Sequence, residues 1–312
     1  MLNLSTHQLN VFLAATETLN FTRAARRLQV TQPSVSQQIQ ALEERLGLPL
    51  FVRSGRNVEL TEAAQVLIPL ARELVYLSVQ VEETIASLKG DVHGHLIVGC
   101  STSTGRYILP RLLASFHRQH PQIRTTCQVT TPDQALQLLA EGKVHLVLAS
   151  NPPPCQDIEF CKFTDEEILL VVPMDHPWAH RSRIGLPELL EADFILPEAG
   201  SETYTAIREA LAEAGMAMDQ LRNLVSLGSL ESIAFSIQEG LGIGFLPKLV
   251  INRLVQGKVA PVQVSGLNIH REVSIGRNTR RQATAAQKAF WGLIQDQVQL
   301  PLQNTGFILQ KA

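Results

Sequence analysis

Arginines near the N-terminus are the first side chains whose type and spacing point to chemistry. Between residues 22 and 58 the chain has six arginines against two glutamates, a local charge of +4 in a chain whose net charge is -2. The first lysine is Lys89. A planar guanidinium matches phosphate and guanine edges better than an ammonium does. The pattern therefore predicts a local contact with nucleic acid and excludes a uniformly basic coat protein.

The third predicted helix has a polar face that could reach DNA bases. That helix starts near Pro33 and ends at Gly47, and its apolar residues recur at helical spacing, so they point inward together. Gln37 and Gln40 then lie on the opposite face, where a glutamine can pair with the N6 and N7 atoms of adenine in a major groove. Hydroxyls at the helix N-terminus can bind phosphate. The alternative is an ordinary solvated glutamine face.

A short hairpin pattern after this helix carries two more arginines. Arg53 and Arg56 flank a Ser-Gly turn, which predicts a wing that touches the DNA backbone or minor groove, whereas the alternative is a surface hairpin with incidental charge. Arg23, Arg26 and Arg27 are weaker candidates, because arginines on a helix surface often only solubilise it. The candidate DNA-contacting residues are Thr31, Gln32, Pro33, Ser34, Ser36, Gln37, Gln40, Arg53 and Arg56.

A run of four hydroxyls in the second half of the chain predicts a ligand site. The run at 101–104 lies between a strand and a helix expected to begin near residue 106, where hydroxyls and free N–H groups can bind an anion. A plain capping loop, which needs only one hydroxyl, is the alternative. Other hydroxyls follow later strands and could face the same cleft. The candidate effector-binding residues are Ser101, Thr102, Ser103, Thr104, Thr130, Thr131, Ser201 and Thr203.

Catalytic, metal and cofactor chemistry find no support in the sequence. The glycines at 240, 242 and 244 precede a strand-like segment rather than a helix, so a dinucleotide loop is excluded. The histidines show no coherent ligand face, and no nucleophile-elbow motif occurs. The chain is therefore expected not to be an enzyme and to need no metal or cofactor. Four scattered cysteines fit a reducing compartment, and a redox pair of Cys155 and Cys161 remains open.

The elements that position these residues divide the 312-residue chain into at least two domains. Residues 1–60 form the predicted helical DNA-binding module. Residues 61–90 form a linking helix with an apolar seam at heptad spacing, which predicts a dimer contact. Pro69 lies inside this helix and predicts a bend or junction there. The seam residues are Leu67, Leu70, Leu74, Leu77, Val81 and Leu88.

From residue 94 onward strands and helices alternate, which predicts an α/β region with a mostly parallel sheet. The alternation occurs in two successive groups, so we expect two lobes within 91–300. The first lobe would contain about 93–165 plus 267–300, because a late strand and helix can return to it. The second would contain about 166–266. Residues 301–312 form a tail without a pattern. The chain shows no export signal and no membrane-spanning run, so a cytoplasmic protein is expected.

The N-terminal motifs resemble those of the LysR-type transcriptional regulators. The resemblance rests on residues that match in order: Leu9 and Phe12, Asn20-Phe-Thr-Arg-Ala-Ala25, Thr31-Gln-Pro-Ser34, Ser36, Ile39, Leu42-Glu43, Leu46-Gly47, Pro49-Leu-Phe51, Arg53, Arg56 and Leu60-Thr-Glu-Ala63. It extends, with looser motifs, over all but about the last ten residues. Gln37 and Gln40 stand where the family often has Arg, and Ala64 stands where it usually has Gly. The first departure bears on which bases are preferred, and not on DNA binding itself.

The resemblance implies a fold, partners and a function. The fold would be an N-terminal all-α winged helix-turn-helix followed by a two-lobed effector domain like type 2 periplasmic binding proteins. The partners would be double-stranded promoter DNA, a small and usually anionic metabolite bound between the lobes, and further copies of the chain in a dimer or tetramer. The segment STSTG-x-Y-x-LP resembles subgroups that act in carbon or sulfur assimilation. A solute-binding protein and a constitutive DNA-organising protein are the alternatives.

Overall fold

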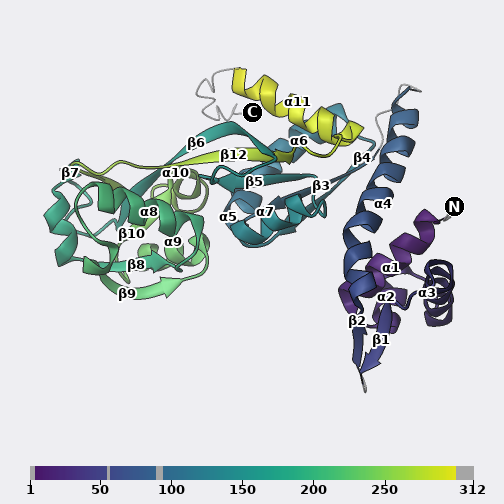
Figure 1. Ribbon diagram of the computed structural model, residues 1–312. Coiled ribbons are helices and arrows are strands. Elements are labelled where there is room, and N and C mark those ends of the chain that lie inside the picture. Colours follow the sequence, from purple (N-terminus) through teal and green to yellow (C-terminus); the bar gives the residue numbers. More distant parts are fainter. Residues whose placement is uncertain (1–3, 55–56, 89–93, 300–312) are drawn as a thin grey trace. The chain divides into compact units, whose positions relative to one another are not determined.

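The computed structural model describes residues 4–54, 57–88 and 94–299 of the chain (Figure 1). It consists of two compact units, one of residues up to about 94 and one that begins at His95. Each unit is described by itself. No helix among the described residues has the length and apolar character needed to cross a membrane.

The first unit contains three short helices, a two-stranded hairpin and one long helix. Side chains that precede the helices start them: the Asn20 side chain accepts a hydrogen bond from the backbone N–H of Arg23 at 3.0 Å, and Thr31 accepts one from Ser34 at 3.4 Å. Gly47, with φ +69°, ends the third helix as predicted. The elements are α1 (Thr6–Thr18), α2 (Phe21–Leu28), α3 (Gln32–Leu46), β1 (Phe51–Ser54), β2 (Asn57–Leu60) and α4 (Glu62–Leu88).

The core of this unit confirms the predicted inward face of α3. Val35, Ile39 and Leu42 are buried against Phe12 of α1. The carboxylate of Glu43 accepts hydrogen bonds from the backbone N–H groups of residues 50 and 51, at 2.7 and 3.1 Å, and so ties the end of α3 to the start of β1. The opposite face of α3 is thereby left to solvent.

Helix α4 runs through Pro69 without interruption, so the expected junction is absent. Its predicted dimer seam stays a prediction, and one of the seam residues has other contacts. Leu67 packs against the core of the first unit rather than lying on an open seam, because the first half of α4 covers α1. Leu70, Leu74, Leu77 and Val81 are exposed, at 53%, 43%, 44% and 57%. They share one face of the helix. The side chain of Leu88 lies outside what the structure describes.

The second unit is built on a mixed eight-stranded sheet and a separate two-stranded sheet of β8 and β9. The strands of the larger sheet follow the order β4-β3-β5-β12-β6-β11-β7, with β10 also paired to β6. Two long strands, β6 and β12, run antiparallel along each other and join the two ends of the unit. We call the end with β3, β4 and β5 lobe 1, and the end with β8, β9 and β10 lobe 2. The strands are β3 (Gly94–Cys100), β4 (Ile123–Val129), β5 (Leu146–Ser150), β6 (Ile158–Pro173), β7 (Arg183–Ile184), β8 (Asp193–Pro197), β9 (Arg222–Leu227), β10 (Gly244–Pro247), β11 (Val259–Val264) and β12 (Ile269–Asn278).

The expectation of a mostly parallel sheet was wrong. Parallel pairing joins β3 to β5, β8 to β9 and β11 to β7, whereas β12 pairs antiparallel with β5 and β6, and β6 pairs antiparallel with β10 and β11. The physical reason is the crossing between lobes: the strand that leaves lobe 1 and the strand that returns to it run in opposite directions and pair with each other. The strand β6 therefore spans the expected lobe boundary at residue 165.

Helices cover the sheet in both lobes. In Figure 1, α6 and α11 lie on one side of the lobe 1 strands and α7 on the other, and the rings of Phe116 and Phe290 pack at 4.9 Å between α6 and α11. In lobe 2, Phe194 and Phe245 stack at 5.7 Å. The longer helices are α5 (Thr102–Tyr107), α6 (Leu109–Gln119), α7 (Pro132–Ala140), α8 (Glu202–Glu213), α9 (Leu230–Gln238) and α11 (Ala285–Gln299).

Candidate functional site

The exposed face and the N-terminus of α3 carry the predicted DNA-contacting residues other than the two wing arginines. Gln37 and Gln40 are exposed, as are Thr31, Gln32 and Pro33, while Ser34 and Ser36 are half-buried. Several of these side chains already have partners within the helix. Gln32 donates to the hydroxyl of Ser36 at 2.7 Å, and Gln40 donates to Glu44 at 3.0 Å. Thr31 caps the helix, so its hydroxyl oxygen already accepts a backbone N–H group.

The predicted wing is a hairpin in which β1 and β2 pair antiparallel, with Arg53 opposite Val58. The side chain of Arg53 and the whole of Arg56 lie outside the described residues, so their contact with DNA stays a prediction. Two of the weaker candidates on α2 have local partners. Arg27 forms an ion pair with Glu17, and Arg23 donates to the carbonyl of Thr18 at 2.9 Å. These contacts favour a role of the two arginines within the module.

In the second unit, hydroxyls from both lobes line one cavity of about 940 Å³. The helix α5 begins at Thr102, so the hydroxyl run forms its first turn rather than a loop before a helix at 106, because Ser101 caps it by accepting the N–H of Thr104 at 3.4 Å. Thr104 is the exception among the predicted residues: it is fully buried, 3.0 Å from the Ser101 hydroxyl. The predicted residues that line the cavity are Ser101, Thr102, Ser103, Thr130, Thr131, Ser201 and Thr203.

Three of these hydroxyls cap helices. Ser101 caps α5, Thr131 caps α7 and Ser201 caps α8, each by accepting a backbone N–H three residues along the chain. Each of these three hydroxyls therefore caps a helix, as the alternative interpretation stated, and that contact uses part of its hydrogen-bonding capacity. This capping also brings three helix N-termini to the edge of one cavity, where their partial positive charge favours an anion.

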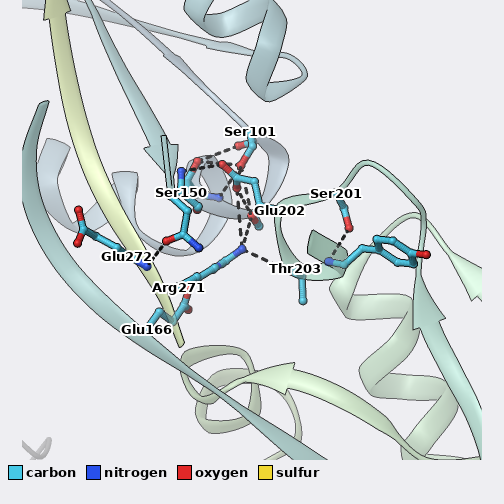
Figure 2. Close-up of polar contacts among 12 residues, drawn as sticks. Ser101, Ser150, Glu166, Ser201, Glu202, Thr203, Arg271 and Glu272 are labelled. Atoms are coloured by element: carbon cyan, nitrogen blue, oxygen red, sulfur yellow. Dashed lines mark hydrogen bonds and ion pairs between the residues drawn. The ribbon is translucent and has the colours of Figure 1, made fainter. Parts of the chain in front are cut away.

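A buried ion-pair cluster beneath the cavity was not predicted from the sequence (Figure 2). Arg271 on β12 is 1% exposed and contacts the carboxylate of Glu166 through Nε at 2.7 Å and Nη2 at 2.6 Å. Its Nη1 atom donates to Thr203 at 3.1 Å and to Ser103 at 3.3 Å, and lies 3.9 Å from Glu202. One guanidinium therefore joins β6, β12 and both lobes.

Glu202, the first residue of α8, reaches from lobe 2 to lobe 1. Its Oε2 atom accepts hydrogen bonds from the hydroxyls of Ser101 at 2.6 Å and Ser103 at 3.3 Å, and its Oε1 atom accepts the backbone N–H of Ser150 at 2.9 Å. Figure 2 shows this carboxylate between the Ser101 and Ser150 donors and the Arg271 guanidinium. The adjacent predicted residues Ser201 and Thr203 were the only sequence signal for it.

The remaining lining of the cavity is acidic. One cation, Arg106, lines it, and that cation is paired with Glu231 at 2.7 Å. The other charged lining residues besides Glu202 are Asp133, Glu198 and Glu209. An anion is therefore favoured only at the end where the hydroxyls and the helix N-termini converge.

Two cysteines next to this site form a pair that the sequence did not indicate. The sulfurs of Cys100 on β3 and Cys127 on β4 lie 3.2 Å apart, and Cys100 directly precedes the capping Ser101. A hydrogen bond from Cys100 lowers the pKa of Cys127 to about 7, whereas that bond and burial raise the pKa of Cys100. Cys155 and Cys161 are half-buried, and their proposed pairing stays a prediction.

Comparisons with known proteins agree with this architecture. Residues 6–65 match the bacterial regulatory helix-turn-helix proteins of the lysR family, and residues 89–299 match the LysR substrate binding domain. The HTH-type transcriptional activator CmpR of Synechocystis is 32% identical over 93% of this chain and 94% of its own length. The RuBisCO operon transcriptional regulator of Allochromatium vinosum is 31% identical over 93% and 95%.

Solved structures share the fold. Full-length CbnR in complex with its target DNA covers 94% of this chain and 100% of its own, with a TM-score of 0.64 and 23% identity. The regulatory domain of Synechocystis CcmR in complex with 2-PG covers 67% of this chain and 99% of its own, with a TM-score of 0.60 and 24% identity. With both family regions matched in order and relatives above 30% identity over nearly the whole length, the chain belongs to the LysR family of transcriptional regulators.

Proposed function

We propose that this regulator acts in the cytoplasm as a homodimer or homotetramer, binds promoter DNA through α3 and the β1–β2 wing, and responds to a small anionic metabolite in the cavity of the second unit. Its regulated genes belong to carbon assimilation, and the chain has no catalytic activity. The observation that carries the effector part is the convergence of seven predicted hydroxyl residues from both lobes on one cavity.

The DNA part rests on the exposed face of α3. The inward face is filled by apolar residues, so the polar face is the only one that can enter a groove. Gln37 is exposed and lies one turn before Gln40, which already donates to Glu44. A glutamine at such a position discriminates adenine through two hydrogen bonds.

Two kinds of support favour an anionic effector from carbon metabolism. The hydroxyl end of the cavity offers O–H and N–H donors and three helix N-termini, all of which stabilise negative charge. The fold relative CcmR was solved with 2-PG, and the relative from Allochromatium vinosum is named for the RuBisCO operon.

DNA footprinting on promoters of carbon-assimilation operons tests the DNA part. Gln37→Ala should relax the preference at one base position at a cost of about 1–3 kcal/mol. Gln137→Ala is a matched control, because Gln137 is also exposed on a helix but lies on α7 of the second unit. Equal loss of affinity on every sequence would contradict base recognition by Gln37.

The salt dependence of binding tests the wing. If each subunit of a dimer neutralises about three phosphates, log K should fall with log salt with a slope of about -5. Replacing Arg53 and Arg56 with Ala should flatten this slope, because two phosphate contacts per subunit are removed. An unchanged slope in the double variant would show that the wing does not contact DNA.

A further inference from the structure

The carboxylate of Glu202 lies where the hydroxyl end of the cavity offers its donors. The Ser101 and Ser103 hydroxyls and the Ser150 N–H all point to its two oxygens, at 2.6, 3.3 and 2.9 Å. The Glu202 side chain is 5% exposed, so water contributes little to its solvation. An internal carboxylate therefore has the surroundings expected of a bound anion.

The same contacts hold the two lobes together. Glu202 belongs to α8 of lobe 2, while its three donors lie at the ends of β3 and β5 and in the first turn of α5, all in lobe 1. Donors that satisfy this carboxylate are not free for a second anion. An external ligand must either bind elsewhere or take these donors from Glu202.

The local charge balance opposes a second anion while Glu202 stays in place. Arg271 is the buried cation of the cluster, and it already faces two carboxylates, Glu166 and Glu202. Adding another negative charge beside them would bring like charges together in a site of low solvent exposure, which is unfavourable. Removing Glu202 from the donors relieves this repulsion and leaves Arg271 paired with Glu166.

We propose that Glu202 is an internal ligand of the anion site, and that an effector binds by displacing its carboxylate from Ser101, Ser103 and the N–H of Ser150. This inference rests on the proposed function, because it states how the same cavity accepts its anion. It also restricts the ligand class. A monocarboxylate gains no more from these donors than Glu202 does, whereas a phosphate group brings more charge and a third acceptor oxygen.

Calorimetry on the full-length protein tests the displacement, with 2-PG, inorganic phosphate and acetate as probes. Glu202→Gln keeps the size of the side chain and removes its charge, so affinity for 2-PG and phosphate should rise roughly tenfold to a hundredfold. Acetate should bind the variant and not the parent protein. Glu213→Gln is the matched control, because Glu213 is exposed on the same helix, α8, and does not line this cavity. Its affinities should equal those of the parent protein.

A second variant covers a change in folding. Glu202→Asp keeps the charge but shortens the reach to Ser101, so its affinity should lie between those of the parent and Glu202→Gln, and thermal melting will show that each variant is folded. If the parent protein binds the anion and Glu202→Gln binds it no more tightly, or more weakly, the displacement is overturned and the proposed effector stays intact. Absence of binding by every variant overturns both. Binding by Glu202→Gln alone supports the displacement.

Discussion

His145 is a buried titratable group whose effect on stability follows from its hydrogen bond. Its Nδ1 atom accepts the backbone N–H of Ile97 at 3.2 Å, which requires an unprotonated nitrogen. Burial, and to a lesser degree the charge of His95, lowers the pKa of His145 from 6.5 to about 4. The folded protein therefore resists protonation that the unfolded chain accepts. The stability that depends on neutral His145 is fully present above pH 6.5 and is lost as the pH falls from 6.5 to 4.

The replacement His145→Asn tests this account. The amide oxygen of Asn can accept the same N–H, but the residue does not titrate. Between pH 7 and 4.5 the parent protein should lose about 2–3 kcal/mol more unfolding free energy than the variant, since each unit of pKa difference corresponds to about 1.4 kcal/mol. Urea denaturation at both pH values measures the difference. Parallel losses in parent and variant would place the acid sensitivity elsewhere.

Cys127 should be the most reactive thiol near neutral pH. Its pKa is lowered to about 7 by the hydrogen bond from Cys100, and the residue is exposed. The rate of alkylation, followed residue by residue by mass spectrometry, should reach half its plateau near pH 7. In Cys100→Ala that midpoint should move upward, because the donor is lost. A midpoint that stays in place would show that another group stabilises the thiolate.

The residue scale also shows what the sequence can and cannot predict about the site. Hydroxyls after strands were recognisable, because each lies next to a local helix start. Arg271 and Glu166 were missed because they are 105 positions apart, and only the pairing of β6 with β12 brings them together. The available signal was an arginine on the apolar face of an alternating strand, the face that also carries Ile269, Val273 and Ile275. Glu202 was hidden by its position as an ordinary first-turn acid.

At the scale of elements, the sequence predicted helices better than sheet pairing. The periodicity of α3 and its Thr31 and Gly47 ends are local properties, and the structure confirms them. The start of α5 was placed four residues too late, because a run of hydroxyls resembles a loop even when Ser101 caps a helix. The antiparallel β6–β12 pair could not be predicted, since its register depends on contacts about a hundred residues apart.

Helix α4 carries the element-scale prediction, because its two halves have different surroundings. Leu74 is 43% exposed on the face shared with Leu70 and Leu77, while Leu67 packs in the core of its own unit. If that face forms the dimer contact, Leu74→Asp buries an uncompensated charge in it and should release monomers. For a dimeric parent protein, light scattering should show half the parent mass. The stability of the separate chain should change little.

The contrasting variant is Leu67→Ala. It should lower the unfolding free energy by about 2 kcal/mol through lost packing, while the mass in solution stays that of the parent. A Leu74→Asp protein that keeps the parent mass would exclude this face of α4 as the dimer contact. Together the two variants separate assembly from folding, because each is expected to change one measurement only.

At the scale of the whole molecule, regulation requires that the anion bind two states of the protein with different affinity. A ligand shifts the DNA complex only by that difference, which is typically about 1–3 kcal/mol between coupled sites. Ser103 lines the cavity. Its hydrogen bonds with Glu202 and Arg271 also join the two lobes. The state of the lobes and the occupation of the cavity therefore depend on the same hydroxyl.

Ser103→Ala should weaken the response to the anion while leaving the affinity for DNA in its absence unchanged, because Ser103 belongs to the second unit and not to the helix-turn-helix. The measurement is operator affinity with and without 2-PG, whose ratio should fall at least about fivefold in the variant. Ser182→Ala is the control, since Ser182 is exposed and does not line the cavity. If Ser103→Ala keeps the full ratio, the anion acts without this hydroxyl. If the parent protein binds the operator equally well with and without 2-PG, its DNA binding is independent of the anion, and the cavity has a structural role.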